Sequence, residues 1–382
     1  MEGETLVDSA GPAETVHTAT TPAVGGSYSG VDPMGPVDFL NATLVPFAQD
    51  TVWPFGGLGT WNVIGNTTEP MYWWAKCSLS QAERCTWSTP RSFTFTATSG
   101  TAHASVTIQR GPAAPVTARL ETVAATGFYG VFWQPPAGRN NHIGVVEWSG
   151  ALNNPVGAML AAHGYPTLDL AWYGEPGLPQ SGQGLRLEYA AKALHWIGTQ
   201  PGVNPKRLWA MGYSSGSETA LLLGVDYPNL VHGVAALSPD VVAACNAFGA
   251  GSPTWTLGGQ PVPCTNQSQY PPTDTPAAAI PVANIHGPVL IDCGEHDSWS
   301  SCASFVPAVM AQLAAAHDSY AHQLLEYPDA GHGLGSLLPY YPGLAAFGLL
   351  LTPTSGFKGT SMVGNSLALA DQWPKVLAFL RN

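Results

Sequence analysis

The N-terminal third of the chain contains short segments in which apolar and polar residues alternate. Ser92–Thr98 and Ala104–Gln109 are two of them, and Gly, Pro, Ser and Asn cluster between such segments. A period of two is typical of strands that bury one face. The pattern predicts a smaller, all-β, sandwich-like N-terminal domain over residues 1–122.

From residue 123 onward, apolar runs alternate with segments of helical periodicity. This alternation is typical of a mostly parallel sheet covered by helices, so residues 123–382 are predicted to form an α/β domain. The expected strands are Phe128–Trp133, Ile143–Trp148, Pro166–Trp172, Arg207–Met211, Val231–Leu237, Pro288–Asp292 and His322–Tyr327. The expected helices are Pro155–His163, Leu185–Ile197, Ser217–Tyr227, Ala303–His317 and Ser366–Arg381.

One stretch interrupts this alternation. Residues 243–282 are rich in Gly, Pro, Ser and Thr and show neither period. Such excursions from a regular scaffold commonly carry function. We expect an insertion that forms a lid or a pocket wall.

The net charge of the chain limits the kinds of molecule that it can bind. The 382 residues include 13 Lys plus Arg and 25 Asp plus Glu, which gives a net charge of −12. An acidic surface disfavours nucleic acid, anionic membranes and large polyanions such as coenzyme A. No apolar run reaches the ~18 residues needed to span a bilayer. The composition therefore favours a small or neutral substrate, and it leaves the oligomeric state open.

The six cysteines fall into three neighbouring pairs, and their spacing differs from the tight C-x₂₋₄-C pattern of metal sites. The prediction is three local disulfides, Cys77–Cys85, Cys245–Cys264 and Cys293–Cys302, which would require an oxidising compartment. The first 25 residues have no apolar core and are not a signal peptide. We therefore expect a secreted protein whose signal peptide was removed; a cytoplasmic protein is the alternative.

The sequence Gly212-Tyr213-Ser214-Ser215-Gly216 fits the G-x-S-x-G pattern of a nucleophile elbow. An apolar run precedes it and a helix-forming run follows, which is the strand–turn–helix setting that an elbow requires. The register selects Ser214 as the nucleophile. The oxyanion hole is expected to combine the N–H of Ser215 with that of Gly150 or Ala151, in the loop after Ile143–Trp148.

A serine hydroxyl needs a base and an orienting acid. His332 follows the last apolar run and lies between two glycines, which suits a loop that presents the imidazole. Two acids are candidates: Asp292 ends the preceding run, and Asp297 follows it. Asp297 is preferred because it lies on the loop itself, and a Cys293–Cys302 disulfide would close that loop. Several aromatic residues lie near the ends of the expected strands: Trp148, Trp172, Tyr173 and Trp299. Each of them is expected either to line a substrate pocket or to pack in the core.

Several motifs together resemble the acyl-CoA thioesterase / bile acid-CoA:amino acid N-acyltransferase family over nearly the whole chain. They are Gly25–Gly35 (GGSYSGVDPMG), Leu170–Tyr173, Leu187–Tyr189, Gly212–Gly216, Gly294–Asp297 with Trp299, and Tyr327–His332. The resemblance implies an α/β-hydrolase fold after a β-sandwich domain whose first strands are either missing or precede residue 1. It also places the acid at Asp297. In this family a Ser nucleophile goes with hydrolysis and Cys with acyl transfer. The chain departs from the family at Ser215, where Lys is common.

Together these features predict a serine hydrolase that cleaves carboxylic ester or thioester bonds through a Ser214–His332–Asp297 acyl-enzyme mechanism, without metal or organic cofactor. Two enzymatic alternatives are an acyl-CoA thioesterase proper and an acyltransferase to an amine or alcohol. A binding module on an inactive hydrolase fold is the non-enzymatic alternative, and the filled triad positions disfavour it.

Overall fold

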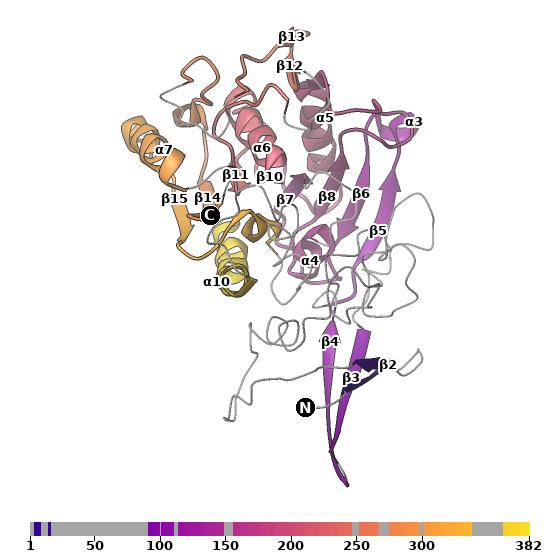
Figure 1. The fold of residues 1–382 in the computed structure, drawn as a ribbon. Helices are drawn as coiled ribbons and strands as arrows, with labels where there is room; N and C mark the ends of the chain where they lie inside the picture. Colours follow the sequence, from indigo (N-terminus) through magenta and orange to yellow (C-terminus); the bar gives the residue numbers. More distant parts are fainter. Residues whose placement is uncertain are drawn as a thin grey trace.

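The computed structural model describes residues 4–8, 14–16, 91–99, 101–110, 114–148, 156–246, 252–266, 275–297, 299, 302–337 and 362–382. In the N-terminal region these residues form one antiparallel sheet of order β2-β1-β3-β4 (Figure 1). Its strands are β1 (Glu4–Asp8), β2 (Glu14–Val16), β3 (Arg91–Ser99) and β4 (Ala102–Arg110). A sandwich needs a second sheet, which does not occur among the described residues, so the sandwich-like arrangement stays a prediction.

The larger sheet has eight strands in the order β15-β14-β11-β10-β7-β8-β6-β5. All neighbouring pairs are parallel except those made by β6, which runs antiparallel to both β5 and β8. The strands are β5 (Thr117–Glu121), β6 (Tyr129–Gln134), β7 (Gly144–Trp148), β8 (Thr167–Ala171), β10 (Leu208–Tyr213), β11 (Gly233–Leu237), β14 (Val289–Gly294) and β15 (His322–Tyr327). The predicted domain boundary at residue 122 follows β5, yet β5 pairs within this sheet; the domain division itself stays a prediction.

Helices cover both faces of this sheet (Figure 1). They are α3 (Val123–Thr126), α4 (Val156–Ala162), α5 (Leu187–Gly198), α6 (Ser215–Asp226), α7 (Cys302–Ala316) and α10 (Met362–Phe379), with the 3-10 turns η5 (Val282–Asn284) and η6 (His332–Ser336). A third sheet joins β9 (Leu185–Arg186), β12 (Trp255–Leu257) and β13 (Gln260–Pro261). Leu185–Arg186 was expected to begin a helix; instead Leu185 pairs with Trp255 of the insertion, and α5 begins at Leu187.

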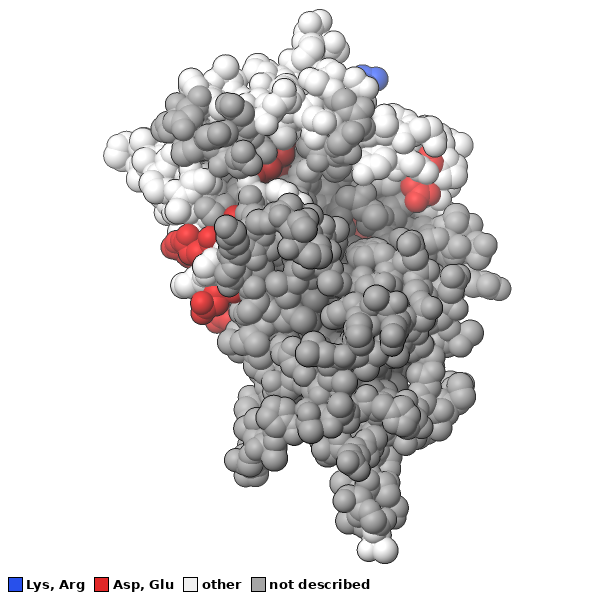
Figure 2. All heavy atoms as spheres, viewed as in Figure 1, with Lys and Arg blue, Asp and Glu red and all other residues white. Residues whose placement is uncertain are grey.

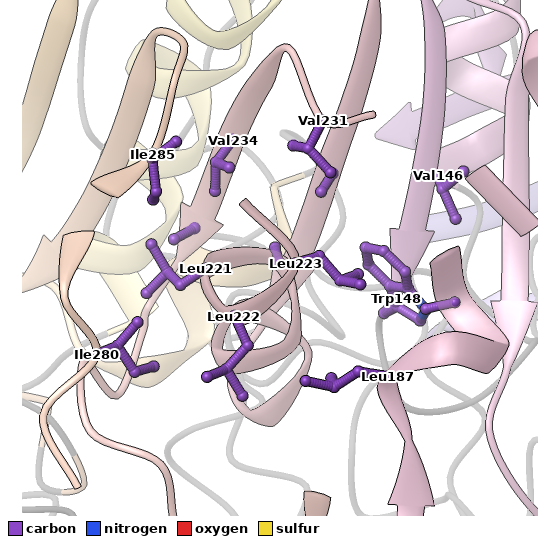
Figure 3. Packing of buried hydrophobic residues seen from close by; sticks show 14 of the residues in the cluster. Val146, Trp148, Leu187, Leu221, Leu222, Leu223, Val231, Val234, Ile280 and Ile285 are labelled. Carbon is purple, nitrogen blue, oxygen red and sulfur yellow. The ribbon is translucent and has the colours of Figure 1, made fainter. Parts of the chain in front are cut away.

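Alternate strand residues point into two separate cores, as a period of two requires. On β7, Val146 packs with the helices α5 and α6, whereas Val145 packs with α4 and α10. Figure 3 shows the first core, where Leu221, Leu222 and Leu223 of α6 lie among strand side chains. The result is a three-layer α/β/α arrangement, and it confirms the predicted α/β-hydrolase fold. In the described part of the chain, no helix is both long and apolar enough to cross a membrane.

Candidate active site

Ser214 lies in a sharp turn between β10 and α6. Its backbone has φ +55° and ψ −126°, a conformation that non-glycine residues rarely adopt and that often marks functional positions. Its N–H donates to the carbonyl of Leu237 on the neighbouring strand, at 2.9 Å. The turn thus raises the Ser214 hydroxyl at the carboxyl edge of the sheet.

Two glycines make this turn possible. A Cβ atom on Gly212 would lie 2.1 Å from the carbonyl oxygen of Gly216, and one on Gly216 would lie 2.2 Å from the carbonyl oxygen of Trp148. Both distances are far inside van der Waals contact, so any larger residue would push the strand and the helix apart. The G-x-S-x-G pattern therefore has a steric cause in this chain.

The structure brings together the three side chains selected from the sequence. Nε2 of His332 lies 2.9 Å from Oγ of Ser214, and Nδ1 lies 2.7 Å from Oδ2 of Asp297. The residues follow three strands at the same sheet edge: Ser214 follows β10, Asp297 follows β14 and His332 follows β15. His332 and Asp297 are buried, with 2% and 3% of their surface exposed. Burial strengthens their electrostatic contact, because little water screens it.

The loop that carries Asp297 is fixed at both ends. The predicted Cys293–Cys302 disulfide is present and encloses it. The second carboxylate oxygen, Oδ1, accepts the backbone N–H of Trp299 at 2.9 Å. These contacts restrict the rotation of the carboxylate and keep Oδ2 directed at the imidazole.

Two hydroxyl groups hold the backbone of His332. Tyr213 Oη donates to its carbonyl oxygen at 3.0 Å, and Ser238 Oγ donates to the same atom at 3.3 Å. Burial raises the pKa of Tyr213 well above its usual value, and the charges of Asp297 and Asp292 raise it further. Tyr213 therefore stays protonated and remains a donor.

Asp292, the other candidate acid, has a different environment. Its Oδ1 accepts the backbone N–H of Ser238 at 2.6 Å, and no described residue offers a hydrogen bond to Oδ2. Burial raises the pKa of Asp292 to about 8, and the charge of Asp297 adds to this effect, whereas the Ser238 N–H opposes it. The carboxyl group is therefore mostly protonated at neutral pH.

Replacing Asp292 by asparagine is expected to reduce the pH dependence of stability. Between about pH 4 and pH 8, the folded protein keeps a proton that the unfolded chain releases. Stability from this group is therefore lost as pH rises, by at most about 1.4 kcal/mol per pH unit. The unfolding free energy of the variant minus that of the wild type should increase from pH 5 to pH 8 and then level off. Urea titrations followed by tryptophan fluorescence measure this difference in unfolding free energy at each pH. A difference that stays constant from pH 5 to pH 8 would contradict a protonated Asp292.

Ser215, one predicted oxyanion donor, begins α6, so the N-terminal end of that helix lies beside the nucleophile. The partial positive charge of a helix N-terminus favours an anion there. The other two candidates, Gly150 and Ala151, lie outside the described residues, as do Cys77 and Cys85. Their assignments stay predictions.

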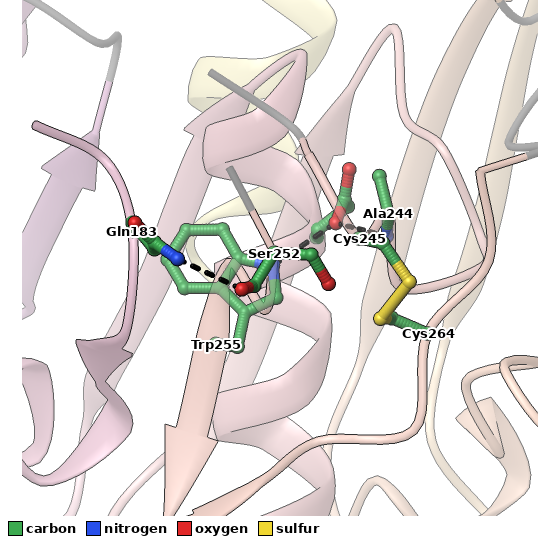
Figure 4. Close-up of a disulfide and its surroundings, with 7 residues drawn as sticks. Gln183, Ala244, Cys245, Ser252, Trp255 and Cys264 are labelled. Carbon is green, nitrogen blue, oxygen red and sulfur yellow. Dashed lines mark hydrogen bonds between the residues drawn. A yellow bond between two sulfur atoms is a disulfide. The ribbon is translucent and has the colours of Figure 1, made fainter. Parts of the chain in front are cut away.

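Glu218, one turn into α6, joins the helix of the nucleophile to the insertion. It is fully buried, and Oε2 accepts the backbone N–H of Ala244 and the indole N–H of Trp255, both at 3.0 Å. Figure 4 shows Ala244 and Trp255 together with the Cys245–Cys264 disulfide. Burial raises the pKa of Glu218 well above its usual value, and the charge of Asp240 raises it further. The predicted Cys245–Cys264 disulfide closes the insertion directly after Ala244. The insertion is thus anchored to the elbow helix.

Within the described part of the chain, one group combines potential metal ligands: Glu295, Cys302 and Glu326. Its sulfur is bonded to Cys293 and is not a free thiolate. A hydrogen bond with Glu295 raises the pKa of Glu326, and burial adds to this rise. The group therefore offers at most its two carboxyl groups, and no thiolate, to a metal ion.

Figure 2 shows that Asp and Glu outnumber Lys and Arg among the described residues on the face it presents. Three of the described basic side chains pair with acids: Arg119 with Glu121, Arg186 with Glu188, and Lys375 with Asp371. These pairs reduce the positive charge available to a polyanionic ligand.

Comparisons with known proteins agree with this architecture. The sequence profile described as "BAAT / Acyl-CoA thioester hydrolase C terminal" matches residues 185–382. Acyl-coenzyme A thioesterase 6 of Mus musculus is 24% identical over 95% of this chain and 82% of its own length. The peroxisomal succinyl-coenzyme A thioesterase of Mus musculus is 24% identical over 94% and 82%. Acyl-coenzyme A thioesterase 1 of Rattus norvegicus is 25% identical over 58%, and the chain spans only 54% of that relative.

Among solved structures, a dienelactone hydrolase-like promiscuous phosphotriesterase from metagenomic libraries aligns with 69% of this chain and 98% of its own. The TM-score is 0.43 and the sequence identity 16%. The strand order and the elbow define the fold.

Proposed function

Because the chain belongs to the BAAT / acyl-CoA thioester hydrolase family, we propose that it is a serine hydrolase of carboxylic ester or thioester bonds. One observation carries the proposal: the hydrogen-bonded series from Asp297 through His332 to Ser214, at 2.7 and 2.9 Å. This arrangement activates a serine hydroxyl, since the imidazole takes its proton and the carboxylate stabilises the imidazolium. The family match supports hydrolysis of an ester or thioester.

The reaction takes place in two steps. Ser214 Oγ attacks the substrate carbonyl while His332 Nε2 accepts the hydroxyl proton. The Ser215 N–H, with Gly150 or Ala151, stabilises the oxyanion, and His332 then protonates the leaving alcohol or thiol. In the second step His332 deprotonates a water molecule, which attacks the acyl-enzyme; the bond from Ser214 Oγ to the acyl group breaks, His332 returns the proton to Oγ, and the carboxylic acid is released.

Fluorophosphonate labelling followed by peptide mapping tests this proposal. The probe should modify Ser214 in the folded protein and no other serine, because the imidazole of His332 lies 2.9 Å from the Ser214 hydroxyl and activates it. Absence of label on Ser214 would sink the proposal and favour a binding module on an inactive hydrolase fold.

The substrate class requires a second experiment. The named relatives act on acyl-coenzyme A thioesters, whereas the net charge of −12 and the paired basic residues favour a less anionic leaving group. A chain-length series of p-nitrophenyl esters and matching acyl-CoA thioesters separates the two. Faster cleavage of the uncharged esters is expected, and activity confined to acyl-CoA would show an acyl-CoA thioesterase proper.

The acyltransferase alternative uses the same triad with a different acceptor. Adding an amine or an alcohol in excess would then divert product from free acid to conjugate. With Ser214 as the nucleophile we expect free acid to remain the main product at every acceptor concentration, as measured by mass spectrometry.

We also propose that the protein acts in an oxidising, extracellular environment. The two disulfides support this location. Relatives are named as mitochondrial or peroxisomal, so the location rests on the disulfides alone. Thiol titration of protein from its native source, in denaturant, tests it; six free thiols would contradict it.

A further inference from the structure

We propose that Tyr213 and Ser238 are positioning residues for the catalytic base. Their two hydroxyl groups bind the same atom, the carbonyl oxygen of His332, and we call this arrangement the carbonyl clamp. Asp297 fixes the imidazole of His332, whereas the carbonyl clamp fixes its backbone, so that Nε2 stays within reach of the Ser214 hydroxyl. The inference rests on the proposed function, because it concerns proton transfer within the same triad.

The two arms of the carbonyl clamp come from neighbouring strands of the large sheet. Tyr213 is the last residue of β10, and Ser238 directly follows β11. Their hydroxyl groups donate to the carbonyl oxygen of His332 at 3.0 and 3.3 Å. Tyr213 also immediately precedes Ser214, so the nucleophile and one arm of the clamp belong to the same turn of the chain. A shift of the His332 backbone away from this turn therefore breaks the bond to Tyr213.

Gly335 shows how closely the turn that begins at His332 packs against both arms. A Cβ atom on Gly335 would lie 2.3 Å from Cδ2 of the Tyr213 ring and 2.7 Å from Oγ of Ser238. The φ angle of Gly335 lies outside the left-handed region, so its backbone conformation does not require glycine. The missing side chain instead lets η6 approach the two residues that hold its first carbonyl group.

Ser238 has a backbone conformation that is rare for its residue type. Its φ is +43°, in the left-handed region, and its N–H donates to Oδ1 of buried Asp292 at 2.6 Å. Glycine would adopt this φ at a lower cost, but it has no hydroxyl group to donate. Strained residues of this kind cluster at functional sites. The hydroxyl bond to His332 gives a reason for serine at this position.

The arrangement of two donors on one acceptor predicts a particular kind of non-additivity. When one hydroxyl group is lost, the other still holds the His332 carbonyl group. When both are lost, neither strand end binds it through a side chain, and the base can move relative to Ser214. A displacement of about 1 Å at a catalytic group can cost about 100-fold in rate.

The test measures kcat and KM for the best ester of the chain-length series. Tyr213→Phe and Ser238→Ala are each expected to lower kcat about threefold, and the double variant about 100-fold, whereas independent effects would give about ninefold. KM should change less than about twofold, because the carbonyl clamp acts on the base and not on the substrate. The rate of fluorophosphonate labelling should fall in parallel with kcat, since it depends on the same activation of Ser214.

Two further variants separate positioning from stability. Gly335→Ala keeps both hydroxyl groups but inserts a methyl group between them and η6, and it should lower kcat at least about tenfold. Ser238→Gly removes the hydroxyl group and the backbone strain together. It should lose as much kcat as Ser238→Ala while its thermal midpoint is no lower than that of Ser238→Ala.

Tyr165→Phe is the matched control. Tyr165 is a buried tyrosine whose hydroxyl group also donates to a backbone carbonyl, that of Leu377 in α10, and neither residue belongs to the triad or the clamp. The control should lower the thermal midpoint to an extent similar to that of Tyr213→Phe and leave kcat at the wild-type value.

Two results would overturn the inference. A double variant whose kcat falls no further than the product of the two single effects would show that the hydroxyl groups do not share a task. A rise in KM without a fall in kcat would place them in substrate binding instead. Ser214→Ala in the same assay distinguishes the two proposals: if it abolishes activity, the hydrolase proposal stands whatever the clamp variants do, and activity that survives it would overturn both.

Discussion

Ser214→Ala is expected to lower kcat for the best ester or thioester by roughly 10⁴- to 10⁶-fold, while the fold is retained. The loss is large because Ser214 Oγ is the hydroxyl that lies 2.9 Å from His332 Nε2 and is activated by it. Some rate above that of water should remain, since the oxyanion donors and the binding site are unchanged. Initial rates at saturating substrate measure the effect.

Ser181→Ala is the matched control, because Ser181 lies on an exposed loop between β8 and β9. It should keep wild-type activity and wild-type labelling by fluorophosphonate. Equal thermal midpoints for the three proteins would exclude unfolding as the cause. Activity of Ser214→Ala within tenfold of the wild type would remove Ser214 from the mechanism.

Local sequence patterns were enough to predict most of the α/β-hydrolase fold. Each expected strand from Phe128–Trp133 to His322–Tyr327 overlaps a strand of the eight-stranded sheet, with ends that differ by at most two residues. These segments carry their own signal, because a buried strand must be apolar along its whole length. The position of β5 could not be read in this way. The place of β5 in the sheet follows from its pairing with β6, and the apolar pattern of a strand does not show which strand it pairs with.

In the candidate site, too, local features could be predicted from the sequence, whereas contacts between distant residues could not. Ser214 could be selected because the steric demands of the elbow are local and leave the G-x-S-x-G pattern. Tyr213, Ser238 and Glu218 were not selected, although they hold His332 and the insertion in place. Their partners lie 26 to 119 residues away in the sequence. The one available signal was an acid, Glu218, shortly before the apolar run of the expected helix Ser217–Tyr227. A carboxyl group that is buried needs hydrogen-bond donors.

A comparison of Asp297→Asn with Asp292→Asn decides which of the two acids orients His332. Asp297→Asn is expected to lower kcat roughly 10⁴-fold, because an amide in place of the carboxylate holds the wrong imidazole tautomer and cannot stabilise the imidazolium. Asp292→Asn is expected to stay within about threefold at pH 7, because a carboxyl group that is protonated there already resembles an amide in charge and shape. Both substitutions replace one carboxyl oxygen by an amide nitrogen. A difference in kcat between the two variants therefore comes from the surroundings of the two side chains.

Rates for both variants at pH 7, with the thermal midpoint of each, decide the assignment. Asp297→Asn should bind substrate nearly as well as the wild type, since the carboxylate is buried and contacts Nδ1 of His332, not the Nε2 that faces Ser214. The opposite order of effects would make Asp292 the orienting acid. In that case the 2.7 Å contact between Asp297 and His332 would not be the one used in catalysis, and the imidazole would have to turn towards β14 to reach its partner.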